Sequence, residues 1–113
     1  MERWSQLFKA LSEPVRLRLL HLLAQGGEVC VCDLVNVLGV SQSMVSRHLA
    51  YLRNSGWVVS RRDGLWMHYR LAGGEESLRA EVLAVLARHA QNEPTMATDL
   101  ERLQNLDREA GSC

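Results

Sequence analysis

Apolar side chains recur every three or four residues over most of the chain, which is the spacing of one face of an α-helix. The pattern predicts helices over residues 2–11, 14–25, 41–56, 76–91 and 96–106, and a shorter one within 28–40 that starts between Cys30 and Asp33. The helix over 14–25 is apolar on nearly every side, so we expect it at the centre of the fold. Its core face is formed by Val15, Leu19, Leu22 and Leu23.

Residues that favour helix boundaries mark several of these ends. Ser12, Ser41 and Thr95 have short side chains that accept hydrogen bonds from a first helical turn, so we expect them to act as N-caps. Pro14 suits a first turn, and Gly39 suits the residue after a last one. A short helix, a turn containing glycine and a second helix with a polar face form a helix-turn-helix.

After Gly56 the pattern changes to that of β-strands. Residues 57–62 (WVVSRR) and 66–72 (WMHYRLA) are rich in β-branched and aromatic side chains, and Asp63-Gly64 between them is a hairpin turn signal. We expect Trp57 and Trp66 to pack this hairpin onto the domain. The fold class is mainly α (α+β), a winged helix-turn-helix of about five to six helices with a two-stranded wing. Residues 1–106 form one domain, and 107–113 form a flexible tail.

The polar face of the 41–56 helix carries hydrogen-bonding groups and arginines but no acid, where an ordinary surface helix mixes both signs. Such a face suits the edges of bases and the phosphates of DNA. Gln42 and Arg47 are the best candidates for base contacts, because glutamine pairs with adenine and arginine with guanine. His48 lies beside the apolar stripe, so it either contacts DNA or only packs. The expected DNA-binding residues are Gln42, Ser43, Ser46, Arg47, His48, Arg53, Arg61 and Arg62, the last three as phosphate anchors.

The formal net charge is zero, but the charges are unevenly distributed. Residues 41–70 hold five arginines against Asp63 alone, whereas residues 71–113 hold four arginines against eight acids. Phosphate binding needs local positive charge, and the positive charge of this chain is concentrated on the candidate DNA-reading segment. This distribution argues against a winged helix that binds only protein.

Three cysteines are too few, and odd in number, for a disulfide framework. Cys30 and Cys32 are one residue apart, and side chains at that spacing on a regular helix point about 200° apart. Both sulfurs therefore reach one ion only if this stretch is irregular or becomes so. Ion capture would then compete with an intact helix start, and unwinding that start would move the DNA-reading helix. The positive end of the helix favours thiolate, the form that binds metals.

Other interpretations of these residues remain open. The cysteines could be buried packing groups or sites of oxidation. Cys113 is either a third ligand or an incidental terminal thiol. His21 lies on an apolar helix, where a core histidine is favoured over a zinc ligand. His89 and Glu93 have i, i+4 spacing, but we expect them to be surface residues.

Other classes of protein find little support. No stretch approaches the roughly 18 apolar residues of a membrane span, and the N-terminus lacks a signal-peptide pattern, so we expect a cytoplasmic protein. The chain has no glycine-rich cofactor loop, and C-x-C followed by Asp33 is the one candidate nucleophile. We therefore expect neither an enzyme nor an organic cofactor.

Three segments together, GEVCVCDLV, SQSMVSRHLAYLRNSG and RRDGLWMHYRL, resemble the winged-helix metalloregulators of the ArsR/SmtB family, and within it the arsenite-responsive repressors. The resemblance covers roughly residues 5–72. It implies a homodimer packed through the first and fifth helices, which binds an inverted-repeat operator of a metalloid-resistance operon. It further implies release when trivalent arsenic or antimony, As(III) or Sb(III), binds Cys30 and Cys32.

The match departs from the family pattern at one position. Members with a three-cysteine site have a third cysteine three residues after the second, and this chain has Val35 there. The third ligand of the arsenic or antimony atom is Cys113 or a small cellular thiol, or there is no third ligand. A zinc-, cadmium- or redox-responsive repressor of the same fold is the alternative.

Overall fold

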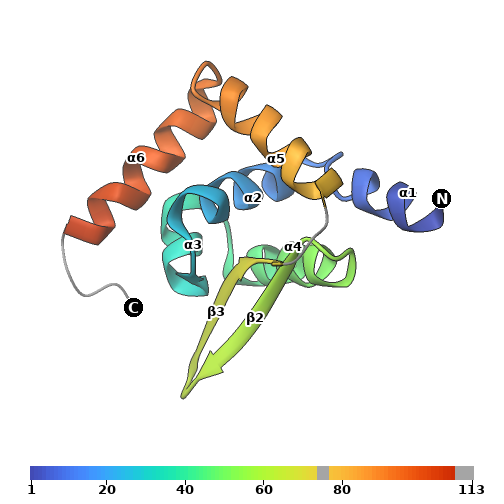
Figure 1. The fold of residues 1–113 in the computed structure, drawn as a ribbon. Coiled ribbons are helices and arrows are strands. Elements are labelled where there is room, and N and C mark those ends of the chain that lie inside the picture. Colours follow the sequence, from blue (N-terminus) through green and yellow to red (C-terminus); the bar gives the residue numbers. More distant parts are fainter. Residues whose placement is uncertain (74–76, 109–113) are drawn as a thin grey trace.

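The computed structural model describes residues 1–73 and 77–108. Figure 1 shows α2 in the middle of the molecule, α5 and α6 across one side of it, and α4 with the hairpin on the other. In order along the chain, the described elements are α1 (Glu2–Lys9), α2 (Pro14–Gly26), β1 (Val29–Cys30), α3 (Val31–Leu38), α4 (Gln42–Asn54), β2 (Val58–Asp63), β3 (Trp66–Leu71), α5 (Ser77–Ala90) and α6 (Pro94–Arg108).

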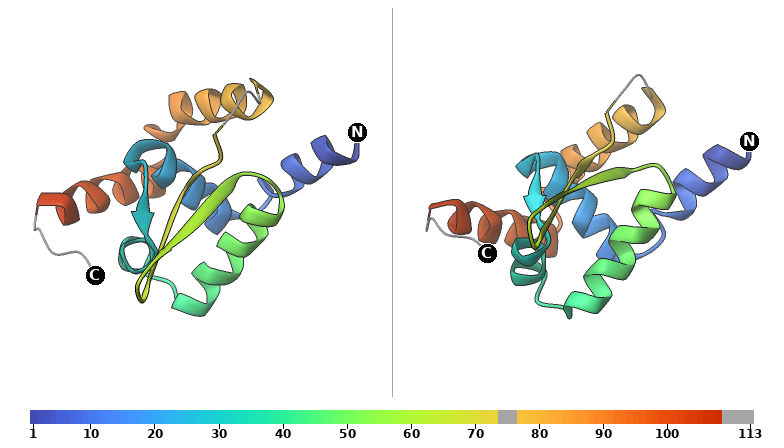
Figure 2. Two further views of the ribbon diagram at one scale, coloured as in Figure 1. Left: turned by 60° about the horizontal axis from the view of Figure 1, so that its bottom comes forward. Right: turned by 90° about the horizontal axis from the view of Figure 1, so that it is seen from below.

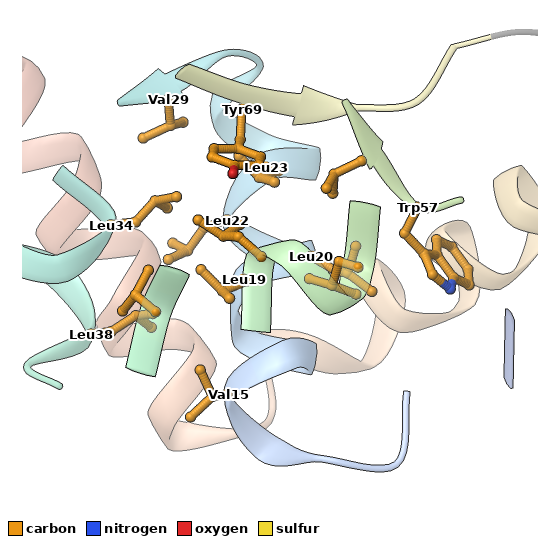
Figure 3. Close-up of a cluster of buried hydrophobic side chains, with 14 of the residues drawn as sticks. Val15, Leu19, Leu20, Leu22, Leu23, Val29, Leu34, Leu38, Trp57 and Tyr69 are labelled. Atoms are coloured by element: carbon orange, nitrogen blue, oxygen red, sulfur yellow. The ribbon is translucent and has the colours of Figure 1, made fainter. Parts of the chain in front are cut away.

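The predicted central helix is confirmed, since α2 supplies the largest share of the core. Its four expected core residues are buried, and so are Leu20 and His21. Figure 3 shows the leucines of α2 packed among side chains from α3, α4 and the sheet, including Leu34, Leu38 and Tyr69. Burial of this apolar surface is the main force that holds the helix-turn-helix against the rest of the domain.

Two of the three predicted N-caps are wrong, and for the same reason. Both α2 and α6 begin at a proline, and the residue before each proline is a glutamate whose carboxylate accepts a hydrogen bond from the first turn. Proline takes the first helical position, so the extended residue before it becomes the cap. Glu13 and Glu93 fill these places instead of Ser12 and Thr95. The third prediction is confirmed, because Ser41 Oγ accepts a hydrogen bond from the Met44 amide at 3.2 Å.

The wing is part of a larger sheet than the hairpin that the pattern predicted. A two-residue strand, β1, pairs antiparallel with β3, giving a three-stranded sheet in the order β1-β3-β2. The hairpin register joins Asp63 to Trp66, so its two loop residues are Gly64, at φ +62°, and Leu65. Because β1 ends at Cys30, the wing is joined directly to the strand that carries the first cysteine of the pair.

The two tryptophans that were expected to pack behave differently. Trp57 is buried, and its indole Nε1 donates to the Leu7 carbonyl at 2.9 Å, which ties α1 to the start of the wing. Trp66 does not pack the hairpin down; its side chain is 47% exposed next to Leu65 at the tip. The prediction for Trp66 is wrong because the strands extend past the body of the domain, where no surface is available to cover it.

A buried ion pair fastens α6 to the centre of the fold. Asp99, on α6, is buried and accepts hydrogen bonds from Arg18 Nε at 2.8 Å and from its terminal nitrogen at 3.0 Å. Arg18 also donates to the Leu38 carbonyl, and Arg102 of α6 donates to the Val37 carbonyl. Two cations thus meet the last carbonyls of α3, the negative end of that helix.

The two ends of the described chain lie far apart. Figure 2 shows α1 and α6 at opposite ends of the molecule in both views. On α1, Trp4 and Phe8 are largely exposed although both are apolar. Within the described ranges, no helix is long and apolar enough to cross a membrane. The predicted tail, residues 109–113 with Cys113, lies outside the described part of the chain.

Candidate nucleic-acid interface and thiol site

The polar face of α4 is exposed as expected. Five of the predicted readers on this helix reach solvent: Gln42, Ser43, Ser46, Arg47 and Arg53. The opposite face is sealed by Val45, Leu49 and Leu52, which are fully buried. One helix therefore combines a firm hydrophobic anchor with a projecting row of donors, which is the division of roles that a groove-binding helix requires.

Further contacts hold α4 against α2. The Arg16 guanidinium carbon lies 4.1 Å from the centroid of the Tyr51 ring, and Arg16 Nε donates to the Ala10 carbonyl at 2.7 Å. A guanidinium at that distance from an aromatic face is attracted to it. The two contacts of Arg16 fix the last turn of the reading helix to the turn that precedes α2.

His48 lies on the α2 side of the reading helix. Its side chain is 13% exposed, and its Nδ1 lies 3.7 Å from Glu13 Oε2 and 3.4 Å from a terminal nitrogen of Arg16. These neighbours support the packing interpretation more than a base contact. A role for His48 in DNA binding therefore stays a prediction, and the weaker one among the residues of α4.

The wing presents its two arginines next to the hairpin turn. Arg61 and Arg62 are adjacent on β2 and both are exposed. Since side chains alternate along a strand, they project from opposite faces of the sheet. Arg61 donates three hydrogen bonds to the Glu28 carboxylate, the shortest 2.6 Å. This pair raises the pKa of Arg61 and lowers that of Glu28, chiefly through the hydrogen bonds.

The sulfur atoms of Cys30 and Cys32 lie close to each other. Cys30 caps α3 with an extended backbone, φ −70° and ψ 143°, and Cys32 lies in the first turn. Their sulfurs are 3.3 Å apart, longer than the about 2.05 Å of a disulfide bond, so they are not bonded to each other. The pair spans the junction of β1 and α3, so the 200° separation of a regular helix does not apply. Capture of an ion by both sulfurs therefore does not require α3 to unwind.

A small hollow beside the pair gathers further donor groups. It measures about 190 Å³ and lies between the sheet, the start of α3 and Leu103 of α6. Its polar lining consists of Glu28, Cys30, Asp33 and His68, groups that bind metals. Among the described residues, no three such side chains already stand at metal-binding spacing.

Sequence reasoning missed Glu28 and His68 as neighbours of the thiol pair. His68 is the register partner of Cys30 across the β1–β3 pairing, and Glu28 immediately precedes β1. A strand of two residues is too short to show alternation, so no pattern in the sequence predicts the pairing. The one feature of the sequence that points to Glu28 is its position two residues before Cys30. In an extended segment, two such side chains lie on the same face.

The other candidate ligands lie elsewhere. His21 is buried in the core under α5 and α6, and burial lowers its pKa. His89 and Glu93 are exposed, and Glu93 caps α6. These positions agree with the interpretation of His21 as a core histidine and of His89 and Glu93 as surface residues.

Comparison with known proteins gives concordant matches. Residues 13–60 match the family described as "Bacterial regulatory protein, arsR family". The chain is 42% identical over 101 residues to the arsenic resistance transcriptional regulator ArsR2 of Pseudomonas putida, which covers 89% of this chain and 86% of that relative. It is 52% identical over 67 residues to the arsenical resistance operon repressor of Escherichia coli. That match covers 59% of this chain and spans only 57% of the length of that relative.

A cadmium-related protein and a solved structure extend the set. The chain is 37% identical over 67 residues to a cadmium resistance transcriptional regulatory protein of Staphylococcus aureus, covering 59% of this chain and 55% of that one. The solution structure of a homodimeric winged helix-turn-helix DNA-binding domain from Mycobacterium bovis superposes with a TM-score of 0.66 at 33% identity. The superposition covers 81% of this chain and 85% of that one.

Proposed function

Since this chain belongs to the ArsR family of bacterial regulatory proteins, we propose that it is a homodimeric repressor of a metalloid-resistance operon. It releases its operator when As(III) or Sb(III) binds Cys30 and Cys32. The family and the winged helix-turn-helix fold are those of DNA-binding transcriptional regulators and not of enzymes. The proposed operator is an inverted repeat, because a two-fold symmetric dimer reads two equivalent half-sites. The protein acts in the cytoplasm.

The main support for a thiophilic effector is that the sulfurs of Cys30 and Cys32 lie 3.3 Å apart. This is less than twice a metal–thiolate bond of about 2.3 Å, so one ion can bond to both sulfurs. Sulfur ligands select thiophilic ions over the hard cations that prefer oxygen. Names of relatives from two organisms refer to arsenic or arsenical resistance, which supports arsenic over other thiophilic ions.

The bonding chemistry balances without a redox step. Arsenite in neutral water is As(OH)₃. With Cys30 and Cys32 both in the reduced form, each thiol that bonds to arsenic would pass its proton to a departing hydroxide. Bonding to Cys30 and Cys32 therefore releases two waters and leaves one hydroxide on arsenic. A third thiol, from Cys113 or a small cellular thiol, replaces that hydroxide where it is available.

The location of the pair suggests how binding leads to release. Cys32 lies in the first turn of α3, which packs on the reading helix α4, and Cys30 lies in β1, which pairs with wing strand β3. An arsenic atom that bridges the two sulfurs links the strand to the helix. Any shift at this junction therefore reaches both DNA-contacting elements.

The exposed apolar side chains of α1 and α5 support the proposed dimer contact through these two helices. Trp4 is 52% exposed, Phe8 47% and Val85 45%, and α1 projects away from the body of the domain (Figure 2). Large apolar side chains gathered on projecting elements mark protein–protein contact surfaces.

A titration of the DNA complex tests the proposal. An operator duplex is first selected from a random-sequence pool with the wild-type protein. The complex is then titrated with arsenite, antimonite, zinc and cadmium and followed by fluorescence anisotropy. We expect arsenite and antimonite to dissociate the wild-type complex but not that of a Cys30→Ser/Cys32→Ser variant. A Cys113→Ser variant, measured in the same way, shows whether the third thiol contributes to release.

Two outcomes would reject the proposal. Equal arsenite release from the double serine variant would show that the cysteine pair is not the sensor. Retention of DNA by the wild-type protein at saturating arsenite and antimonite would remove both as effectors.

Zinc or cadmium is the second candidate effector, and the hollow beside the pair favours it. Glu28, Asp33 and His68 supply the nitrogen and oxygen donors that tetrahedral zinc accepts alongside two thiolates. The cadmium-related relative agrees with this alternative. Release by zinc or cadmium without release by arsenite would establish it. Release by a mild thiol oxidant alone would instead indicate redox sensing.

A further inference from the structure

One ion pair joins the segment of the cysteine pair to the wing. Arg61 Nε lies 2.9 Å from each oxygen of the Glu28 carboxylate, and a terminal nitrogen of Arg61 lies 2.6 Å from Oε1. The side chains are 55% and 31% exposed respectively, so both reach solvent and the pair can open. The two residues are 33 positions apart in the sequence.

The sheet places this ion pair next to the sensing residues. Cys30 is the register partner of His68 on β3, and His68 is in turn the partner of Arg61 on β2. These three residues therefore form one row across the three strands and project from the same face. Glu28, two residues before Cys30, lines the same hollow as Cys30 and His68. The carboxylate thus lies between a candidate effector ligand and a candidate DNA contact.

The hydrogen bonds from Arg61 to Glu28 limit how Arg61 can bind a DNA phosphate. A guanidinium binds phosphate strongly through two parallel N–H groups, and here the Nε edge is already occupied by a carboxylate. The neighbouring Arg62 projects from the other face of the sheet and has no such carboxylate partner among the described residues. The two wing arginines therefore differ in their freedom to reach a phosphate.

We infer that Glu28 is a positioning residue that competes with operator phosphate for Arg61, and that it carries the state of the cysteine pair to the wing. The second part rests on the proposed function. DNA binding breaks the Glu28–Arg61 pair and transfers Arg61 to a phosphate. Ligation of Cys30 and Cys32 fixes the segment that follows Glu28 and so holds the carboxylate on Arg61.

The first experiment uses DNA without any effector. Wild-type protein and Glu28→Gln are compared on a short mixed-sequence duplex over a range of salt concentrations. We expect Glu28→Gln to bind more tightly. The slope of the logarithm of the DNA-binding constant against the logarithm of the salt concentration should steepen by about 0.9 for each added phosphate contact. A dimer adds one contact from each protomer, so the expected change is about 1.8. Glu101→Gln removes the same charge at an exposed position of α6, which is not part of the sheet, and is the matched control.

The Arg61→Ala background makes this test specific. Without Arg61, Glu28 loses its hydrogen-bonded partner, so Glu28→Gln should no longer change the slope. Two results would overturn the inference: Glu28→Gln behaving like Glu101→Gln, or Glu28→Gln binding DNA more weakly than wild type. The second would mean that Glu28 supports the wing in its DNA-binding shape.

The second experiment measures coupling to the effector. The factor by which saturating arsenite weakens operator binding is compared between wild type and Glu28→Gln, and we expect a clearly smaller factor in the variant. An unchanged factor, with wild type still released, would reject Glu28 as the link and leave the proposed function standing. Absence of release in wild type would reject the proposed function, while competition between Glu28 and phosphate is still decided by the salt dependence.

Discussion

Replacing Asp99 with alanine should destabilise the domain far more than an ordinary surface substitution. Asp99 is 2% exposed and accepts two hydrogen bonds from Arg18, at 2.8 and 3.0 Å. Its carboxylate raises the pKa of Arg18, first through these hydrogen bonds. Arg18 stays charged even without Asp99, because the ordinary pKa of an arginine lies far above neutral pH. Asp99→Ala therefore leaves the largely buried Arg18 cation without its hydrogen-bonded counter-charge.

The expected loss is about 2–3 kcal/mol. Breaking a buried ion pair by removing one partner costs roughly 3–5 kcal/mol. The Arg18 side chain keeps 19% of its exposure, so solvent recovers part of this cost. Replacement of both residues by leucine removes the unpaired charge, and we expect the double variant to be more stable than Asp99→Ala.

Urea unfolding followed by circular dichroism, at one fixed protein concentration because the protein is proposed to dimerise, measures this loss. Glu101→Ala, on the exposed side of the same helix, is the control and should change stability by less than about 0.5 kcal/mol. A loss below about 1 kcal/mol in Asp99→Ala would refute the reasoning. A double leucine variant less stable than Asp99→Ala would refute it as well.

Three further predictions address the core, the DNA interface and the dimer. Burial lowers the pKa of His21 below its usual 6.5, so the unfolded state binds more protons than the folded state. The stability of the folded state should therefore fall as pH drops below about 6.5. His21→Gln should reduce the difference between the urea midpoints measured at about pH 7.5 and 5.5. Arg62→Ala should weaken binding to all duplexes and flatten the salt dependence by about 1 per contact, whereas Gln42→Ala should mainly narrow the ratio of operator to mixed-sequence affinity. Trp4→Ser with Phe8→Ser should raise the dimer dissociation constant in analytical ultracentrifugation without loss of helical signal; an unchanged constant would exclude α1 from the interface.

Much of the fold follows from local periodicity. The central position of α2, the boundaries of α4 and the hairpin after Gly56 depend on residues close together in sequence, so apolar spacing and turn residues predict them. Ser41 is the correct cap because no proline follows it. At Ser12 and Thr95 the neighbouring proline shifts the helix start, and cap preference alone does not include that effect.

The features that position the candidate site depend on contacts between distant residues. Glu28 and Arg61 are 33 residues apart, and Arg18 and Asp99 are 81 apart, so neither pair leaves a local pattern. The cysteine pair illustrates the same limit. The spacing of the two cysteines identifies them and leaves open whether the stretch is irregular. It does not predict the strand that makes Cys30 extended, because that strand forms only by pairing with β3.

The most direct test of the account measures arsenite affinity with and without operator DNA. If Cys30 and Cys32 form the sensor, DNA and arsenite oppose each other, and linkage requires equal effects in both directions. We predict that saturating operator weakens arsenite binding by the same factor by which arsenite weakens operator binding. Equal arsenite affinities for the free and the DNA-bound protein would contradict the account.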